Sequence, residues 1–234
     1  MLKNDYLHLF FDLDHTLWDF ESSARATFID MFLHFRLNSM GVPDSMHFAD
    51  TYHQHNNRLW ALYRDGKLDK EVLRSLRFYD TLFDYGIDNQ KLSEELSDYY
   101  LYHAPRRVFL FPGAIEVVQV LEKKYSLHLI TNGFAEVQSI KLQESGLKKF
   151  FTTIITSEEA GVKKPDPQIF KLALEKAGAL AGQSLMIGDD LEVDILGAKS
   201  AGIDQVYFNP AGSKSSNGVA TLEIKDLYQL LDYL

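Results

Sequence analysis

The sequence predicts an α/β fold, a doubly wound parallel sheet with a helical domain inserted after the first strand. Two observations lead to this class. Short apolar runs alternate with segments of helical period over much of the chain, which is the pattern of parallel βαβ units. A long segment, residues 19–104, breaks the alternation because it carries helical patterns and almost no strand signal.

Five strands are predicted from the short, nearly continuous apolar runs, which are typical of a sheet buried on both faces. They are Tyr6–Leu13, Ser126–Ile130, Thr152–Thr156, Ser184–Ile187 and Gln205–Phe208. Five helices are predicted outside the insert. One follows the insert, three lie between the later strands, and one lies near the end of the chain. They cover Ala114–Lys123, Ala135–Glu144, Pro167–Lys176, Val193–Ala201 and Lys225–Tyr233.

The insert reads as a small helical bundle, since its helical segments are separated by short turns that contain glycine. The expected helices are Glu21–Leu37, Ser45–Arg64, Lys70–Tyr85 and Gln90–His103. We therefore expect a core domain made of residues 1–18 and 105–234, and a cap domain made of residues 19–104.

Composition narrows the class of protein. The 234 residues are 46% hydrophobic and 24% charged, and no apolar stretch approaches the length of a membrane span. The N-terminus lacks the features of a secretory signal, and the absence of cysteine excludes disulfides and thiolate chemistry. The net charge of −9 disfavours binding to a nucleic acid polymer. We expect a soluble cytoplasmic protein without a membrane partner, a monomer or a weak homodimer.

Two carboxylates, Asp12 and Asp14, stand at the end of the first predicted strand. Alternation along a strand would put both on the same side, where their charges would crowd unless a cation lay between them. A hard divalent ion such as Mg²⁺ is suited to oxygen ligands of this kind. Taken alone, the pair is better explained by a turn with one capping and one solvated acid.

Three further polar groups follow later strands. Thr131-Asn132-Gly133 could cradle an oxyanion, Lys164 could face a phosphate, and Asp189, Asp190 and Asp194 form another acidic cluster. Each has a simpler explanation as turn residues, a solvated lysine or helix caps. All of them, however, fall at the carboxyl ends of successive predicted strands, the edge where ligands bind in open α/β sheets.

These residues resemble the four motifs of haloacid dehalogenase (HAD) superfamily hydrolases, in order. The matching segments are Phe11–Leu17, Thr131–Gly133, Lys164-Pro165, and Gly188-Asp189 followed by Asp194. The resemblance implies a Rossmann-like core with a cap. The run Ile130–Phe134, the stretch Leu142–Leu147 and the wholly helical cap are similar to the bacterial pyrimidine-nucleotide 5′-nucleotidases. The resemblance implies a small phosphate ester as the substrate, with a pyrimidine nucleoside 5′-monophosphate as the candidate.

The resemblance also implies a role for each residue. Asp12 would be the nucleophile that takes the phosphoryl group, and Asp14 the acid and base that serves the leaving oxygen and then water. Mg²⁺ would be bound by Asp12, Asp189 and the backbone carbonyl of Asp14. The phosphoryl oxygens would be held by Thr131, Asn132, Gly133 and Lys164. Asp194 would orient Lys164 or a water on the metal. Asp190 would lie near these residues, at a position where relatives often carry a small hydroxyl residue.

The insert begins just after the first motif, so it could act as a lid over the site. Residues around the start of the insert and within it are candidates for substrate contact, although packing or surface pairing explains each one more simply. They are Trp18, Phe20, His53, His55 and Arg77.

Other chemistries share the core motifs. A sugar phosphatase, a phosphoglycolate phosphatase, a pyrophosphatase and a phosphomutase all stay open. Asp14 argues against a 2-haloacid dehalogenase, because halide leaves without a proton. A phosphoaspartate signalling module is a remote alternative, since its acceptor lies in the middle of a much shorter chain.

Overall fold

The computed structural model describes residues 5–212 and 215–234. The chain divides into two compact units, one formed by Met1–Phe20 with Val108–Leu234 and the other by Glu21–Arg107. The first unit contains the sheet, and the second contains most of the inserted helices.

The sheet has six strands in the order β3-β2-β1-β4-β5-β6, and all neighbouring strands are parallel. The strands are β1 (His8–Phe11), β2 (Ser126–Thr131), β3 (Thr153–Thr156), β4 (Ser184–Gly188), β5 (Asp204–Phe208) and β6 (Leu222–Ile224). The predicted doubly wound α/β class is confirmed. Strand β6 was not predicted, because it is only three residues long and includes the charged Glu223.

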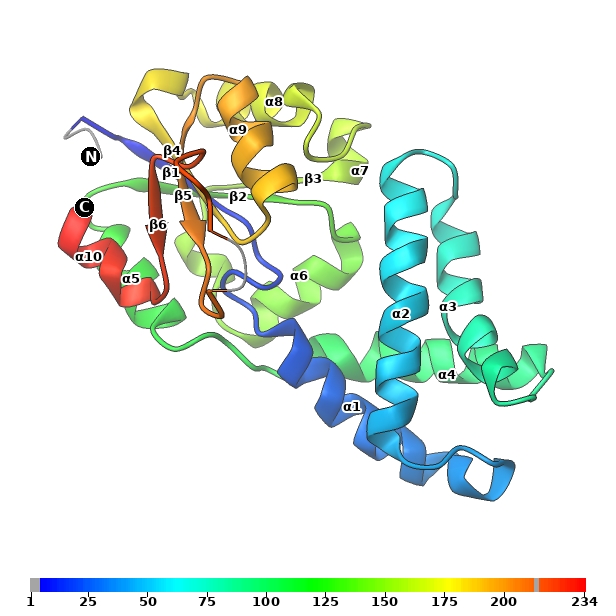
Figure 1. The fold of residues 1–234 in the computed structure, drawn as a ribbon. Helices are drawn as coiled ribbons and strands as arrows, with labels where there is room; N and C mark the ends of the chain where they lie inside the picture. The colour runs from blue at the N-terminus through cyan, green and yellow to red at the C-terminus, as the bar shows by residue number, and fades with distance from the viewer. Residues whose placement is uncertain (1–4, 213–214) are drawn as a thin grey trace. The chain divides into compact units, whose positions relative to one another are not determined.

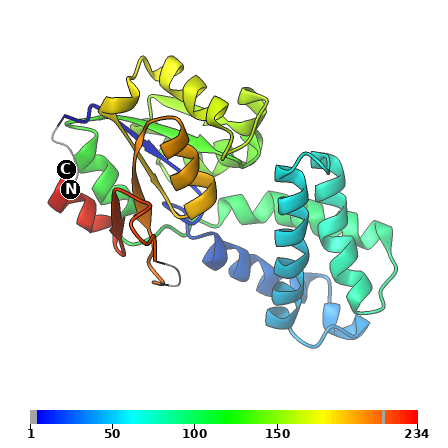
Figure 2. The same ribbon diagram turned by 45° about the horizontal axis from the view of Figure 1, so that its top comes forward.

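Helices cover both faces of the sheet (Figures 1 and 2). One face carries Leu9 and Phe11 and packs against α5 (Ala114–Leu121), α6 (Ala135–Glu144) and α10 (Leu230–Tyr233). The other face carries Phe10 and packs against α8 (Pro167–Ala177) and α9 (Gly197–Ser200). Burial on both faces explains why the strands read as continuous apolar runs rather than as alternating ones.

The strand order brings three strand ends together. β1 lies between β2 and β4, with Phe11 opposite both Leu129 and Ile187. The chain passes outward from β1 to β2 and β3, and then crosses to β4 on the other side of β1. At such a reversal the carboxyl ends of the strands on either side of the crossing border a common crevice.

Two helical segments differ from the prediction. The expected helix Val193–Ala201 is a π-helical segment, Leu191–Leu196, followed by the single turn α9. At the C-terminus, Asp226 and Gln229 form a capping box, so the helical turn Leu227–Gln229 and α10 begin beyond Lys225. A short helix that was not predicted, α7 (Ser157–Ala160), follows β3.

The predicted helical bundle is also confirmed. Its helices are α1 (Phe20–His34), α2 (Ser45–Arg64), α3 (Lys70–Asp84) and α4 (Gln90–His103). The Phe28 ring packs against aromatic rings from each of the other three helices. These are Phe48, Tyr52, Phe78 and Tyr100. This aromatic cluster gives the insert a core of its own.

Three of the substrate-contact candidates, Arg77, His53 and His55, have partners within this unit, whereas Trp18 and Phe20 belong to the first unit. The guanidinium of the buried Arg77 lies 5.9 Å from the Tyr52 ring centre and 5.8 Å from that of Tyr100. His53 lies 3.4 Å from Glu21. His55 is hydrogen-bonded to Asp84 at 2.8 Å. Across the described residues, no helix combines the length and the apolar character that a membrane crossing requires.

Candidate active site

Asp12 follows β1 directly, and its backbone N–H donates to the Ile187 carbonyl at 2.9 Å. This bond extends the pairing between β1 and β4 by one residue, so the backbone of Asp12 is held as firmly as the strand itself. The side chain is buried. Its position therefore depends on the sheet rather than on a flexible loop.

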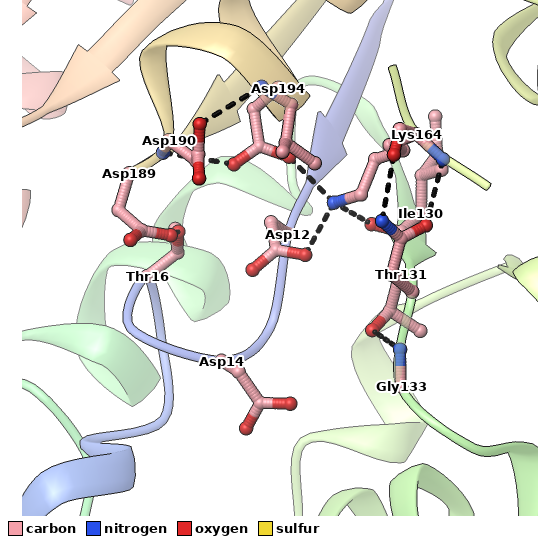
Figure 3. Close-up of polar contacts among 12 residues, drawn as sticks. Asp12, Asp14, Thr16, Ile130, Thr131, Gly133, Lys164, Asp189, Asp190 and Asp194 are labelled. Carbon is pink, nitrogen blue, oxygen red and sulfur yellow. Dashed lines mark hydrogen bonds and ion pairs between the residues drawn. The ribbon is translucent and has the colours of Figure 1, made fainter. Parts of the chain in front are cut away.

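Lys164 supplies the positive charge beside Asp12 (Figure 3). Its Nζ donates to Asp12 Oδ1 at 2.5 Å, to Asp194 Oδ1 at 2.6 Å and to the Ile130 carbonyl at 2.9 Å. The residue is only 1% exposed. Burial by itself would lower the pKa of Lys164, but the two carboxylates outweigh it and the pKa is raised. The ammonium group thus stays charged, with all three of its protons engaged.

The loop that carries Lys164 is held by Asn132. The Asn132 side chain donates through Nδ2 to the Lys164 carbonyl at 2.9 Å and accepts at Oδ1 from the Lys164 N–H at 2.8 Å. Sequence reasoning placed Asn132 on the phosphoryl group. In the structure its amide instead anchors the lysine backbone.

Thr131 is the last residue of β2, and its hydroxyl lies at the edge of the site. Thr131 Oγ1 accepts from the Gly133 N–H at 3.0 Å and from Gln138 Nε2 at 2.8 Å. With two donors on its oxygen, the hydroxyl proton is available for an acceptor such as a phosphoryl oxygen.

The acids that follow β4 complete a cluster with Asp12. Carboxylate oxygens of Asp12, Asp189 and Asp194 all lie within 4.8 Å of one another. Asp189 accepts from Thr16 Oγ1 at 3.2 Å. Gly188 makes this approach possible, because a Cβ there would come within 2.4 Å of the Asp194 carboxylate.

Burial raises the pKa of both Asp12 and Asp189, and their acidic neighbours, Asp194 above all, raise it further. One ammonium group, that of Lys164, contacts two of these three carboxylates. The cluster therefore carries an excess of negative charge on oxygen atoms, and this donor set fits a hard divalent cation such as Mg²⁺.

Asp14 lies outside the acidic cluster, which corrects the expectation that it would crowd against Asp12. β1 ends at Phe11, so strand alternation does not extend to Asp14. Its carboxylate points away from Asp12 and Lys164 (Figure 3). It forms an ion pair with Lys141 and accepts from Gln138 Nε2 at 2.8 Å. Burial favours a higher pKa for Asp14, but Lys141 and Gln138 outweigh it and the pKa is lowered.

Asp190 has a structural task. Its Oδ1 accepts from the N–H groups of Glu192 and Val193, both at 2.9 Å, and so caps the π-helical segment. Its own N–H donates to Asp194 Oδ2 at 3.2 Å. Asp190 thereby helps to hold Asp194, which in turn holds Lys164.

Of the residues predicted for the site, Asp12, Lys164, Asp189 and Asp194 gather into one cluster, and Thr131 and Asp14 are linked to each other through Gln138. The sequence analysis missed Gln138 and Lys141. Both are buried in α6 three residues apart, on the same side of the helix as the buried Leu142. A polar pair on a buried helical face is the signal that could have identified them.

Comparison with known proteins decides the family. Residues 6–202 match the haloacid dehalogenase-like hydrolases. The chain belongs to this family. It is 32% identical to pyrimidine 5′-nucleotidase PynA of Streptococcus pneumoniae, over 98% of this chain and 95% of PynA. It is 30% identical to pyrimidine 5′-nucleotidase YjjG of Escherichia coli, over 95% of each chain.

A solved structure agrees with this assignment. The HAD-hydrolase YfnB of Bacillus subtilis, in a magnesium-bound form, is 28% identical to the chain. The TM-score is 0.87, with 99% of each chain covered. The predicted resemblance to this hydrolase superfamily is confirmed.

Substitution of Lys164 by Met should destabilise the fold when metal is removed by EDTA. The change leaves Asp12 and Asp194 buried without their cation, and breaking a buried ion pair in this way costs about 3–5 kcal/mol. Urea unfolding at pH 8 would measure the loss against Lys171→Met, which removes an exposed lysine of α8. A loss below about 1 kcal/mol for Lys164→Met would contradict the central role of the ammonium group.

Proposed function

We propose that the chain hydrolyses pyrimidine nucleoside 5′-monophosphates in a Mg²⁺-dependent reaction, with Asp12 as the nucleophile. The observation that carries the substrate is the similarity to PynA and YjjG, both pyrimidine 5′-nucleotidases, which extends over nearly the whole chain and includes the insert. The reaction type is supported by the family match as well as by these two relatives. The chain is a phosphoric monoester hydrolase of the haloacid dehalogenase-like family.

In the first half of the reaction, a carboxylate oxygen of Asp12 attacks phosphorus and forms a new P–O bond. The P–O bond to the nucleoside breaks, and its electron pair leaves with the nucleoside oxygen. Asp14 enters this step protonated, because the phosphate dianion that binds beside it opposes a second negative charge, and it gives that oxygen its proton. The products are the free nucleoside and a phosphoryl group on Asp12, so ester hydrolysis is split into two easier steps.

In the second half, a water oxygen attacks phosphorus while Asp14, now a carboxylate, takes a proton from the water. The bond between phosphorus and Asp12 breaks with its electron pair returning to the carboxylate. Inorganic phosphate leaves, and both acids regain their starting protonation.

The protein groups around Asp12 serve mainly to position and neutralise the phosphoryl group, which is most of what this chemistry needs. Thr131 supplies a hydroxyl donor at the end of β2. Lys164 Nζ lies 2.5 Å from Asp12 Oδ1 and places a positive charge beside the attacking carboxylate. Asn132 and Gly133 contribute through the turn, in which the Gly133 N–H orients Thr131.

Asp12 and Asp189, with the backbone carbonyl of Asp14, would hold Mg²⁺. When bound, the ion supplies charge compensation between the carboxylates and the incoming phosphate. Asp194 would keep Lys164 in place, as its 2.6 Å contact with Nζ indicates.

Substitution of Asp12 by Asn should lower kcat for UMP by at least about 10³-fold, because the amide retains the shape but lacks the nucleophilic oxygen. Borohydride added during turnover should convert residue 12 of the wild-type protein to homoserine, which mass spectrometry would detect. Circular dichroism would check that the variant is folded. Retention of a tenth of the wild-type rate would exclude Asp12 as the nucleophile.

Mg²⁺ should raise the melting temperature of the protein in a concentration-dependent way, since a ligand that binds only the folded state stabilises it. Asp189→Asn should abolish most of this response. In EDTA near pH 8 the same variant should melt at or above the wild-type temperature, because the raised pKa of Asp189 means that folding at that pH must either bury its charge or take up a proton, and both oppose folding. Asp232→Asn, at an exposed acid of α10, makes the same charge change and should behave like the wild type. An unchanged Mg²⁺ response in Asp189→Asn would remove Asp189 from the metal site.

The nucleotide assignment predicts a kcat/KM for UMP and dTMP at least about tenfold above that for sugar phosphates, phosphoglycolate and pyrophosphate. Release of inorganic phosphate would be measured for the whole panel, with 3′-UMP as the matched positional isomer. The Asp12→Asn protein, purified in parallel, controls for contaminating phosphatases. A flat profile would refute the nucleotidase assignment and leave the phosphatase assignment intact.

A further inference from the structure

The mechanism above does not use Lys141, a buried cation close to Asp14. The Lys141 side chain on α6 is only 5% exposed, although lysine is among the residues least often buried without a partner. Its ammonium group forms an ion pair with Asp14 Oδ1. It also lies 5.3 Å from the Trp18 ring centre and 5.3 Å from that of Phe20, within the range of cation–π attraction. Lys141 is thus held between one carboxylate and two aromatic rings.

Gln138, one helical turn before Lys141, holds the other oxygen of the same carboxylate. Its Nε2 donates to Asp14 Oδ2 at 2.8 Å and to Thr131 Oγ1 at 2.8 Å. The glutamine therefore ties Asp14 to the hydroxyl that faces the phosphoryl site. Room for it depends on Gly133, where a Cβ would lie 1.9 Å from Gln138 Nε2.

With both oxygens engaged, the Asp14 carboxylate has a defined direction, away from Asp12 (Figure 3). An in-line displacement needs this separation, because the attacking and leaving oxygens lie on opposite sides of phosphorus. An acid that serves the leaving oxygen must lie across the phosphoryl group from the nucleophile.

We propose that Lys141 and Gln138 are positioning residues that aim the Asp14 carboxylate at the leaving oxygen. The inference rests on the proposed function, in which Asp14 donates the proton to that oxygen. Neither residue touches the substrate, and each acts through Asp14. Because Asp14 acts in both halves, the leaving-group effect is isolated in kcat/KM, which reports only the steps up to departure of the leaving oxygen.

This restriction provides the test. A 2,4-dinitrophenolate leaves without protonation, whereas a phenolate or a nucleoside alkoxide depends strongly on the acid. Lys141→Met should lower kcat/KM for phenyl phosphate and UMP by about 10- to 100-fold, the effect expected for a misplaced acid, and kcat/KM for 2,4-dinitrophenyl phosphate by less than about threefold. Asp14→Asn should show the same selectivity in a stronger form.

Two further variants separate positioning from a general loss of structure. Lys141→Arg keeps a cation at the end of a long side chain and should recover most of the kcat/KM for phenyl phosphate. Lys149→Met removes an exposed lysine whose ammonium lies 4.8 Å from the Phe150 ring centre, and it should leave all three rates unchanged. The rate on 2,4-dinitrophenyl phosphate serves as the internal measure of folding.

An equal loss on all three substrates in Lys141→Met, or no loss on any, would overturn the proposal. If the wild-type protein hydrolyses none of these phosphates, the proposed function fails by itself. Crystal structures of the wild type and Lys141→Met would then decide the positioning claim. A displaced Asp14 carboxylate in the variant supports it, and an unmoved one refutes it.

Discussion

The ion pairs of the buried Lys164 ammonium with Asp12 and Asp194 are the interactions on which the site depends. Two carboxylates at the end of a buried sheet would repel each other and lose their hydration, and each would be driven toward its neutral form. The lysine places one positive charge between them and also binds the Ile130 carbonyl at the end of β2. It thereby links the carboxyl ends of β2, β1 and β4. Two further residues keep the lysine and its partner in place. Asn132 holds its backbone, and Asp190 holds Asp194.

The strand order explains why so many charged groups meet. β1 is flanked by β2 and β4, so side chains that follow these three strands are neighbours although more than a hundred residues lie between β1 and the other two along the chain. The register sets the depth at which they meet, since Phe11 is opposite both Leu129 and Ile187. Glycine at position 188 allows Asp194 to approach the end of β4. The apolar strands thus provide rigidity, and the residues just beyond them provide the chemistry.

Sequence patterns were sufficient to predict the elements that are long and strongly periodic, and the polar residues at their ends. The strand that carries Asp12 and the helix α6 were both predicted, the latter with its boundaries. β6 was missed because a three-residue edge strand has too few residues for a period to be seen. The function of Asn132 was also beyond the sequence, because its partner, the Lys164 backbone, lies 32 residues away and meets it only after folding. Lys141 and Gln138 were missed for the same reason, since the burial of a helical face depends on what packs against it.

The two acids at the end of β1 show how position divides chemistry between residues of the same type. The strand ends before Asp12, and the chain then turns through His15, which has a left-handed backbone with φ of 64°. Asp12 still pairs with β4 through its backbone and lies in the acidic cluster, whereas Asp14 lies beyond the strand and contacts Lys141. The pKa of Asp12 is consequently raised and that of Asp14 lowered, although only Leu13 separates them. The departure from strand geometry after Asp12 separates the two acids, and in the proposed mechanism Asp12 bonds to phosphorus while Asp14 moves protons.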